Sequence, residues 1–143
     1  MMECDLLVLG SGAGGLALRV VVAEKAPVLG GTTAWSGGWV WAPGNPLAGR
    51  ADAGEGARDY LRAVLGNRFD AARVDAFLDA APRMVAFFHD NTALRFDGGF
   101  PIPDTYGTQP GAGTGGRSVI AQPYDARGLR ELLPLLRLPL RET

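Results

Sequence analysis

The fold is decided by Asp5-Leu-Leu-Val-Leu-Gly-Ser-Gly-Ala-Gly-Gly15, which opens a stretch that continues to residue 45. Residues 6–9 form a short continuous apolar run, as in a strand that is buried on both faces of a parallel sheet. Gly10, Gly12 and Gly15 then fit the pattern G-x-G-x-x-G. In this pattern the glycines permit a tight turn, the approach of a diphosphate to the backbone, and close packing of a helix on the strand. The stretch therefore predicts a dinucleotide-binding turn.

A carboxylate follows the next apolar run. Residues 20–23 predict a second strand, and Glu24 stands at its end, where it can accept hydrogen bonds from adenosine ribose hydroxyls. The glycine pattern alone is a weak signal because 21 of the 143 residues are glycine, and it also suits a plain turn between two core strands. The flanking strands and Glu24 favour the dinucleotide site because the motif requires that context.

A second glycine-rich loop carries a family resemblance. The sequence from Glu24 to Gly38, Glu-Lys-Ala-Pro-Val-Leu-Gly-Gly-Thr-Thr-Ala-Trp-Ser-Gly-Gly, is followed by Trp41-Ala-Pro-Gly-Asn45. These segments resemble the flavoprotein family that includes 3-ketosteroid Δ1-dehydrogenases and the flavoprotein subunits of fumarate reductase and succinate dehydrogenase. The steroid dehydrogenase branch is the most similar. The resemblance implies bound FAD, and a nicotinamide-only enzyme would not need the second loop.

The resemblance also implies roles for the motif residues. The first glycines would serve the pyrophosphate, Glu24 the adenosine ribose, and the second loop the ribityl chain and flavin. The cofactor-binding residues predicted in this way are Gly10, Ser11, Gly12, Ala13, Gly14, Gly15, Glu24, Lys25, Gly30, Gly31, Thr32, Thr33, Ser36, Gly37 and Gly38. No metal site is predicted, since His89 is the only histidine and has no Cys or His partner at ligand spacing.

The connection between the two predicted strands is short. Only residues 16–19 separate Gly15 from Val20, whereas parallel strands need a crossover of about ten to twelve residues, usually a helix. Leu18-Arg19-Val20 resembles the family's entry to the second strand, so the chain looks like the family with most of its first helix missing. Either the strands still pair in parallel, or they pair differently and the diphosphate site is incomplete.

The predicted fold class is α/β, with a truncated, Rossmann-like FAD-binding domain and a helical and irregular C-terminal portion. A chain of 143 residues is sized for one domain. We assign residues 1–50 to the N-terminal part of the FAD-binding domain. Residues 51–143 form the remainder of that domain and the start of the substrate region. Family members are several times longer, so the economical description is an N-terminal fragment.

The resemblance implies an FAD-dependent oxidoreductase that dehydrogenates CH–CH groups in a 3-ketosteroid-like carbonyl substrate. Its implied process is steroid metabolism, and we expect this chain alone to be inactive. A non-enzymatic remnant without cofactor and a fragment of a fumarate reductase-like or succinate dehydrogenase-like flavoprotein remain alternatives. Tyr106 is the candidate catalytic residue, because the family uses a tyrosine from this region near its substrate. Tyr106 and Tyr124 can equally be plain loop aromatics.

Composition argues against several partners. A net charge of −1 gives no basic surface for nucleic acid, and no apolar stretch approaches the eighteen or so residues of a membrane span. Cys4 is the only cysteine, so it cannot form an internal disulfide. The N-terminus has no basic residues before its apolar run, which argues against a secretory signal. The family resemblance is the main support for the expected cytoplasmic location.

Helical patterns follow the glycine loops. Residues 55–65 predict a helix that ends at Gly66, and Asp70 is expected to cap a second helix. Pro82 should break that second helix or start another, which would end near Asn91. The aromatic residues on these helices are expected to pack in a core. Those without partners would leave an apolar surface that favours self-association.

The last third of the chain predicts short strands and long loops. We expect strands at 94–96 and 117–121, a turn at 97–99 and a long loop at 101–116. Gly115-Gly-Arg-Ser118 and Pro123-Tyr-Asp-Ala-Arg127 also resemble family segments. Pro134 and Pro139 prevent one long helix in the tail, which should end as an apolar strand or loop without a partner.

Overall fold

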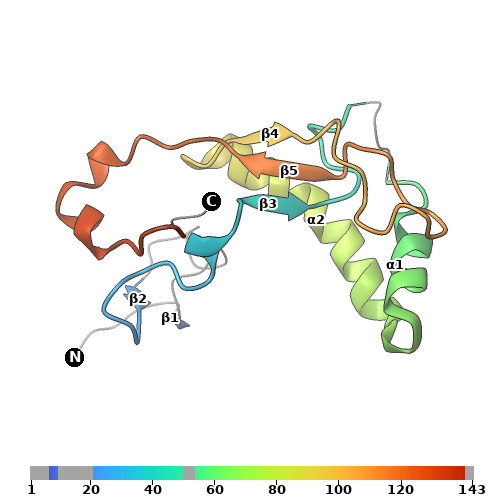
Figure 1. The fold of residues 1–143 in the computed structure, drawn as a ribbon, viewed down its shortest axis with the longest axis horizontal. Coiled ribbons are helices and arrows are strands. Elements are labelled where there is room, and N and C mark those ends of the chain that lie inside the picture. Colours follow the sequence, from blue (N-terminus) through green and yellow to red (C-terminus); the bar gives the residue numbers. More distant parts are fainter. Residues whose placement is uncertain (1–6, 10–20, 50–53, 141–143) are drawn as a thin grey trace. The chain divides into compact units, whose positions relative to one another are not determined.

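The computed structural model describes residues 7–9, 21–49 and 54–140. The chain forms two compact units, which are described separately below. The helix–sheet unit is the continuous segment Trp39–Gln122. The glycine-loop unit combines the two ends of the chain, Met1–Gly38 and Pro123–Thr143. Figure 1 labels the helices and strands of both units.

The helix–sheet unit contains a three-stranded antiparallel sheet in the order β3-β5-β4. The strands are β3 (Trp39–Trp41), β4 (Phe96–Gly98) and β5 (Ser118–Ala121). The strand predicted at 117–121 is confirmed. The turn predicted at 97–99 is wrong in its first two residues, because Asp97 and Gly98 pair with Ile120 and Val119. Pairing with a central strand therefore overrides the local turn preference of this segment.

Two helices precede β4. α1 (Ala57–Leu65) ends at Gly66, whose positive φ of 53° suits a helix terminus. α2 (Ala71–Asn91) begins at Asp70, whose carboxylate accepts a hydrogen bond of 3.2 Å from the Arg73 amide. The predicted end of α1 and the predicted cap of α2 are both confirmed.

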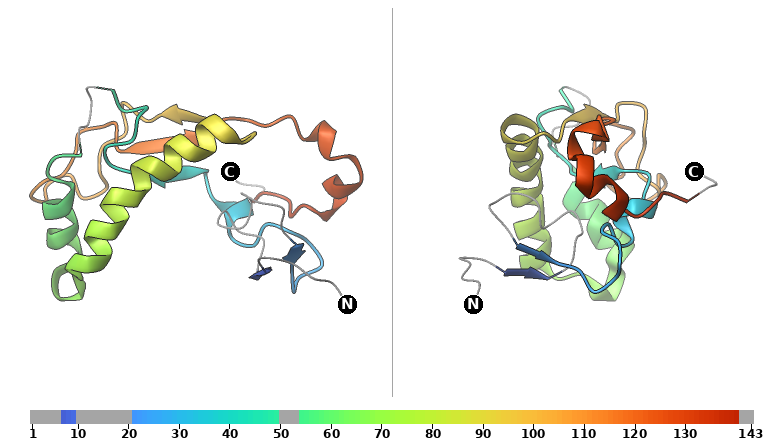
Figure 2. Two further views of the ribbon diagram at one scale, coloured as in Figure 1. Left: turned by 180° about the vertical axis from the view of Figure 1, so that it is seen from behind. Right: turned by 90° about the vertical axis from the view of Figure 1, so that its left-hand side faces the viewer.

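The predicted break at Pro82 is wrong, because α2 continues through it as one helix of 21 residues. Figure 2 shows this long helix crossing one face of the sheet. A proline inside a helix costs about 3 kcal/mol, since its ring clashes with the preceding turn and one N–H is lost. Ala81 and Val85, on either side of Pro82, are buried in the core. Their packing against the sheet offsets the cost, which a local sequence signal does not report.

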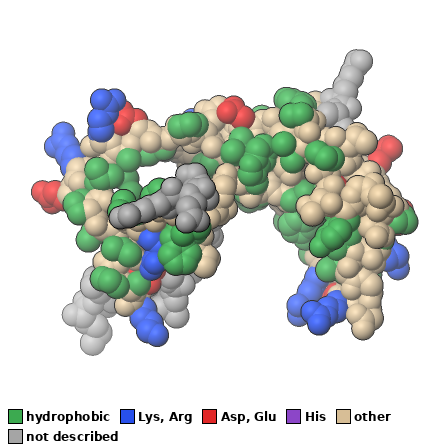
Figure 3. All heavy atoms as spheres, in the orientation of Figure 1, with side chains coloured by type: hydrophobic (Ala, Val, Ile, Leu, Met, Phe, Trp, Pro, Cys, Tyr) green, Lys and Arg blue, Asp and Glu red, His purple; other side chains and the backbone are tan. Residues whose placement is uncertain are grey.

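The core of the helix–sheet unit lies between α2 and the sheet. Its buried members are Ala42, Ala81, Val85, Phe96 and Val119, and Val40, Leu47, Met84 and Phe88 pack against it. This arrangement confirms that part of the apolar helix pattern serves the core. Other large apolar side chains stay at the surface, among them Phe77, Phe87 and Phe100, and Figure 3 shows apolar side chains at the surface in several places.

His89 has a structural role in the last turn of α2. Its Nδ1 accepts a hydrogen bond of 3.1 Å from the amide of Phe96, the first residue of β4. The imidazole therefore fixes how the chain turns from the helix into the sheet.

The glycine-loop unit contains a parallel pair of strands, β1 (Leu7–Leu9) and β2 (Val21–Ala23). Leu7 pairs with Val21, and Leu9 with Ala23. Of the two alternatives for the short crossover, the structure has the parallel pairing. Residues 10–20, which form the connection and carry the G-x-G-x-x-G pattern, lie outside the described residues.

The C-terminal tail does have a partner, contrary to the sequence expectation. Leu136 forms a parallel bridge with Leu29, in which the Leu29 amide donates to Leu135 O at 2.6 Å and the Arg137 amide donates to Leu29 O at 2.8 Å. A short 3₁₀ segment, η4 (Ala126–Leu135), precedes this bridge and changes direction at Arg130. The partner is more than a hundred residues away in the sequence, so no local pattern reveals the pairing.

Candidate functional site

Glu24 directly follows β2, as the dinucleotide motif requires. Its Oε1 accepts a hydrogen bond of 2.9 Å from the Ala26 amide. This bond orients the carboxylate at the carboxyl end of the strand and starts the turn that leads to the second glycine loop. The position agrees with the predicted ribose-binding role, which itself stays a prediction.

The second glycine loop has a backbone that other residues adopt poorly. The φ angles of Gly30, Gly31 and Gly38 are 126°, 53° and 78°, and φ values in this range disfavour residues with a Cβ. A Cβ added at Gly30 would lie 3.0 Å from Ala34 Cβ and 3.5 Å from Arg137 Cβ. At Gly31 the same atom would meet nothing within 4 Å. Gly30 therefore fits a close approach inside the unit, whereas Gly31 lies open at the surface.

Hydroxyl groups surround this open backbone. Thr32, Thr33, Ser36 and Gly37 are exposed, and a single 3₁₀ turn, η2 (Thr33–Trp35), holds the middle of the loop. Ser36 Oγ accepts a hydrogen bond of 3.2 Å from the Gly38 amide. An exposed, glycine-permitted turn with several hydroxyls is the donor set that a ribityl chain or a phosphate accepts. The residues present thus fit the cofactor that the sequence predicts.

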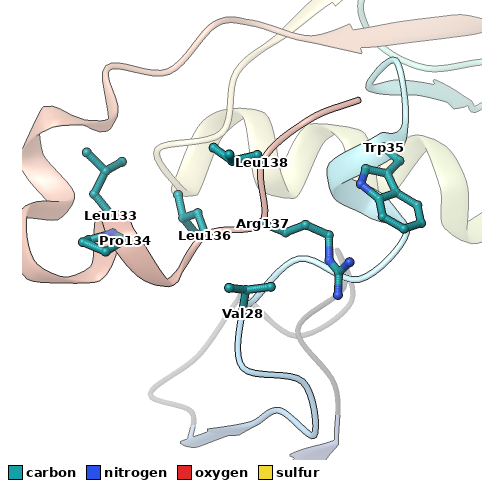
Figure 4. Close-up of a pocket in the computed structure, with 7 residues that line it drawn as sticks. All are labelled: Val28, Trp35, Leu133, Pro134, Leu136, Arg137 and Leu138. Atoms are coloured by element: carbon teal, nitrogen blue, oxygen red, sulfur yellow. The ribbon is translucent and has the colours of Figure 1, made fainter. Parts of the chain in front are cut away.

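No sequence motif predicted the side chains that lie beside this loop. A hollow of about 500 Å³ has Arg137 in its wall together with apolar side chains from both ends of the chain. Figure 4 shows Arg137 extending toward Trp35. The Arg137 guanidinium carbon lies 5.0 Å from the centre of the Trp35 ring, at cation–π distance. The apolar members of the lining are Val28, Trp35, Leu133, Pro134, Leu136 and Leu138.

The loop that carries Tyr106 is held by a buried ion pair. Arg117 Nη1 donates to Asp104 Oδ2 at 2.6 Å, and the two side chains are only 4% and 2% exposed. Asp104 also accepts hydrogen bonds of 2.7 Å from Trp41 Nε1 and from the Gly113 amide. The Arg117 guanidinium donates as well to the Gly111 and Glu55 carbonyls, at 2.8 Å and 2.6 Å. We call these contacts the Asp104–Arg117 clamp.

Tyr106 itself points into solvent. Tyr106 is exposed, with 57% of its full surface area accessible to solvent. Its backbone amide donates a hydrogen bond of 3.2 Å to the Tyr60 hydroxyl. The structure thus fixes the main chain of this tyrosine and leaves its ring accessible. Nothing in this arrangement distinguishes the catalytic role from the loop-aromatic alternative, so the role stays a prediction.

The other family-like segments are also structural in this chain. Asn45 is buried, and its Nδ2 donates to the carbonyls of Ala42 and Gly116 at 2.8 Å and 2.9 Å. The Trp41 ring stacks on Phe77 with centroids 6.0 Å apart. Trp41 and Asn45 therefore join the end of β3 to the loops that precede β5.

The last family-like segment caps η4. Asp125 accepts hydrogen bonds from the Arg127 side chain and from the Arg127 amide, the latter at 3.1 Å. The hydrogen bond from the Arg127 side chain is the main cause that lowers the pKa of the Asp125 carboxyl, and the bond from the Arg127 amide lowers it further. Both side chains are exposed.

The structure assembles only part of the predicted cofactor site. In the glycine-loop unit Glu24 and the loop 30–38 belong to one described segment, and Arg137 lies beside that loop. The residues of the first glycine turn are outside the described part of the chain: Gly10, Ser11, Gly12, Ala13, Gly14 and Gly15. Lys25 is exposed.

A comparison with known families decides the affiliation. The family model described as "FAD binding domain" matches residues 5–140. The chain belongs to this family. The predicted cofactor class and the resemblance to steroid dehydrogenases are thereby confirmed, and the relatives and a solved structure agree with both.

The relatives are dehydrogenases of cyclic ketones. The chain is 40% identical over 141 residues to a 3-oxosteroid 1-dehydrogenase of Mycobacterium tuberculosis, which covers 90% of this chain and 25% of that protein. It is also 40% identical over 136 residues to a 4-oxocyclohex-2-ene-1-carboxylate 5-dehydrogenase of Sinomonas cyclohexanicum, with coverage of 88% and 23%. The chain thus spans about a quarter of the length of these relatives.

A solved structure has a similar fold. The 3-ketosteroid Δ1-dehydrogenase of Sterolibacterium denitrificans, crystallised in complex with 1,4-androstadiene-3,17-dione, superposes with a TM-score of 0.88 at 36% identity. The match covers 97% of this chain and 27% of that one. The chain therefore has the fold of the FAD-binding part of a steroid dehydrogenase.

Two properties concern only the part of the chain that the structure describes. No helix among them has the length and apolar character needed to cross a membrane. Within the same residues, no three His, Cys, Asp or Glu side chains gather as a group that could hold a metal ion.

Proposed function

We propose that this chain is the FAD-binding portion of a flavin-dependent dehydrogenase that acts on a ring carrying a ketone. The family match and the two groups of relatives support the proposal, since the relatives are named for substrates that are cyclic ketones. A 3-ketosteroid is the leading substrate class. The smaller oxocyclohexane carboxylates are the second, because a relative named for them is equally similar to this chain.

The observation that carries the proposal is the second glycine loop. Its backbone is exposed at Gly31, requires glycine at Gly30 and presents the hydroxyls of Thr32, Thr33 and Ser36. We assign these groups to the ribityl and phosphate part of FAD, and Glu24 to the adenosine ribose. The first glycine turn, residues 10–15, completes the cradle in this proposal, with a Rossmann-like arrangement of β1, the crossover and β2.

FAD, when bound, supplies the acceptor for hydride in such a dehydrogenation. The part of this chain is to bind and orient the cofactor and to present a phenol. Tyr106 is the proposed catalytic residue, since its exposed hydroxyl can hydrogen-bond a substrate carbonyl while Tyr60 and the Asp104–Arg117 clamp fix its loop. Residues beyond this chain would complete the substrate site, so we expect the chain alone to be inactive.

Several sequence predictions stay open in this proposal. They are the division at residue 50, a cytoplasmic location, truncation of the fold relative to the family, and self-association through exposed apolar side chains such as Phe77 and Phe87. Size-exclusion chromatography with light scattering tests the last of these directly. A monomer at all concentrations would contradict it.

The central experiment asks whether the purified chain binds FAD. We expect a yellow protein that releases flavin fluorescence on denaturation, or a colourless one that takes up added FAD. A colourless, monodisperse protein that does not bind added FAD would refute the proposal. It would favour the alternative that the chain is a non-enzymatic remnant without a cofactor.

A second variant tests the short crossover. Insertion of about nine helix-forming residues after Ala17 would restore the length that a parallel connection needs. We expect tighter FAD binding by the extended chain, measured by flavin fluorescence. Equal binding by both chains would show that the short crossover is not the defect.

A further inference from the structure

We propose that Arg137, stacked on Trp35, forms a second anion contact for the FAD diphosphate, on the side of the cradle formed by the second glycine loop. This inference rests on the proposed function, and it adds a residue that the sequence motifs do not predict. It concerns the glycine-loop unit only, which holds all the groups involved.

The first argument is the unmet hydrogen-bonding capacity of Arg137. Its Nε is buried and has no hydrogen-bond partner in the described part of the chain. An arginine stays charged at any physiological pH, and a buried donor without an acceptor is costly. The contact with Trp35 does not satisfy this nitrogen, because a cation–π contact supplies no hydrogen-bond acceptor.

The second argument is the surroundings. The hollow beside the guanidinium is lined by apolar side chains such as Val28, Leu136 and Leu138, and it measures about 500 Å³. No carboxylate lies within ion-pair distance of Arg137 among residues 21–49 and 54–140. A cation in a mostly apolar hollow is stabilised by an anionic ligand. Arginine can bind a phosphate through two parallel hydrogen bonds.

The third argument is the position. The Arg137 amide donates to Leu29 O, the residue before Gly30, and the Arg137 Cβ lies 3.5 Å from the point that a Cβ of residue 30 would occupy. The bridge between Leu29 and Leu136 therefore holds Arg137 directly against the second glycine loop. A diphosphate that follows this loop would pass the guanidinium.

The test compares ligands that differ in their phosphates. The full 143-residue chain, the variant Arg137→Gln and the control Arg127→Gln are titrated with FAD, ADP and riboflavin. Arg127 is an exposed arginine of the same unit that is paired with Asp125, so its removal takes the same charge from a different place. We expect Arg137→Gln to weaken FAD and ADP binding by about tenfold or more, the usual effect of one lost charge-assisted hydrogen bond, and to leave riboflavin binding unchanged.

Two further measurements separate binding from folding. Arg137→Lys keeps the charge but loses the bidentate edge, so we expect an intermediate affinity for ADP. Wild-type ADP affinity should fall with added salt more steeply than that of Arg137→Gln. Thermal unfolding followed by circular dichroism reports whether any variant has lost its fold.

The outcomes distinguish this inference from the proposed function. If the wild type binds FAD and Arg137→Gln binds FAD and ADP equally well, only the arginine contact is refuted. An equal loss of FAD and riboflavin would assign Arg137 a purely structural role and would refute it too. If the wild type binds neither FAD nor ADP, the proposed function fails, and this inference fails with it.

Discussion

Polar side chains of the helix–sheet unit and those of the second glycine loop and its neighbour Arg137 are used in opposite ways. In the helix–sheet unit, Trp41, Asn45 and Arg117 donate hydrogen bonds to neighbours within the unit, and Asn45 and Arg117 are buried. In the glycine-loop unit, Thr32 and Ser36 are exposed, and Arg137 has a buried nitrogen without a partner in the described residues.

This difference separates two roles that a polar side chain can have. A residue whose polar groups are all bonded within the protein stabilises a conformation, and its loss should affect folding. A residue whose polar groups face solvent or an open hollow is arranged for a ligand, and its loss should affect binding. The comparison predicts which measurement each substitution will change.

The largest effect is expected at the Asp104–Arg117 clamp. Arg117→Ala leaves a buried carboxylate without its ion pair, which should lower the free energy of unfolding by about 3–5 kcal/mol. Urea unfolding followed by tryptophan fluorescence measures this value. Arg127→Ala, which removes an exposed arginine from an ion pair with Asp125, is the matched control and should change stability little. Similar stability of the two variants would break the comparison.

A smaller loss is expected at Asn45. Asn45→Ala leaves the carbonyls of Ala42 and Gly116 without their side-chain donor, at a cost of about 1–3 kcal/mol in the same unfolding assay. Asn91 makes a comparable bond to the Phe87 carbonyl at an exposed place, so Asn91→Ala serves as control. We expect the control to retain nearly full stability. A control as damaging as Asn45→Ala would show that burial is not the deciding factor.

In the glycine-loop unit the expected effect moves from folding to binding. Gly30→Ala forces a Cβ onto a φ of 126° and against Ala34, which should weaken FAD binding by about tenfold through backbone strain. Gly31→Ala places its Cβ in open space at a φ of 53°, so its effect should be smaller. Flavin fluorescence titration ranks the two variants, and the reverse order would contradict the observed geometry of the loop.

The smallest effect is expected at an exposed ion pair between the helices. Arg58 on α1 donates to Asp75 on α2 at 2.6 Å, and this hydrogen bond is the main cause that lowers the pKa of the Asp75 carboxyl. A lowered pKa means that the contribution to stability is present above the ordinary aspartate value of about 3.9 and is lost as the pH falls through the lower folded value.

Asp75→Asn tests that sign. The wild type should be slightly more stable than the variant at about pH 6, and the difference should disappear as the pH falls through the lowered pKa of Asp75. Urea midpoints across this range provide the measurement. A difference that stays constant down to the lowest pH would show that the effect comes from packing and not from charge.

The sequence predicted local elements well where the signal was itself local. Asp70 caps α2 because a carboxylate before a helical pattern bonds to the first-turn amides, and Gly66 ends α1 because it accepts a positive φ. It failed where distant residues decide. α2 runs through Pro82 because Ala81 and Val85 pack on the sheet, and the tail pairs with Leu29 across the length of the chain.

The candidate site divides in the same way. The glycine pattern, Glu24 and the Gly-Gly-Thr-Thr loop were readable as a cofactor motif because each requirement for a tight turn or a close approach falls on one residue type. Arg137 and the partnership of Asp104 with Arg117 were not, since arginines and aspartates at these spacings have no distinguishing pattern.

By itself, the sequence determined the FAD-binding family of this chain and the residues that form its second glycine loop. Backbone conformations that disfavour a Cβ require glycine, so they can be recognised in the sequence. The tertiary structure alone decided that Arg117 lies buried in a clamp and that Arg137 faces a hollow beside that loop. The physical reason is that burial and charge pairing depend on which distant segments meet. An arginine looks the same in the sequence whether the fold buries it in an ion pair or places it beside a hollow.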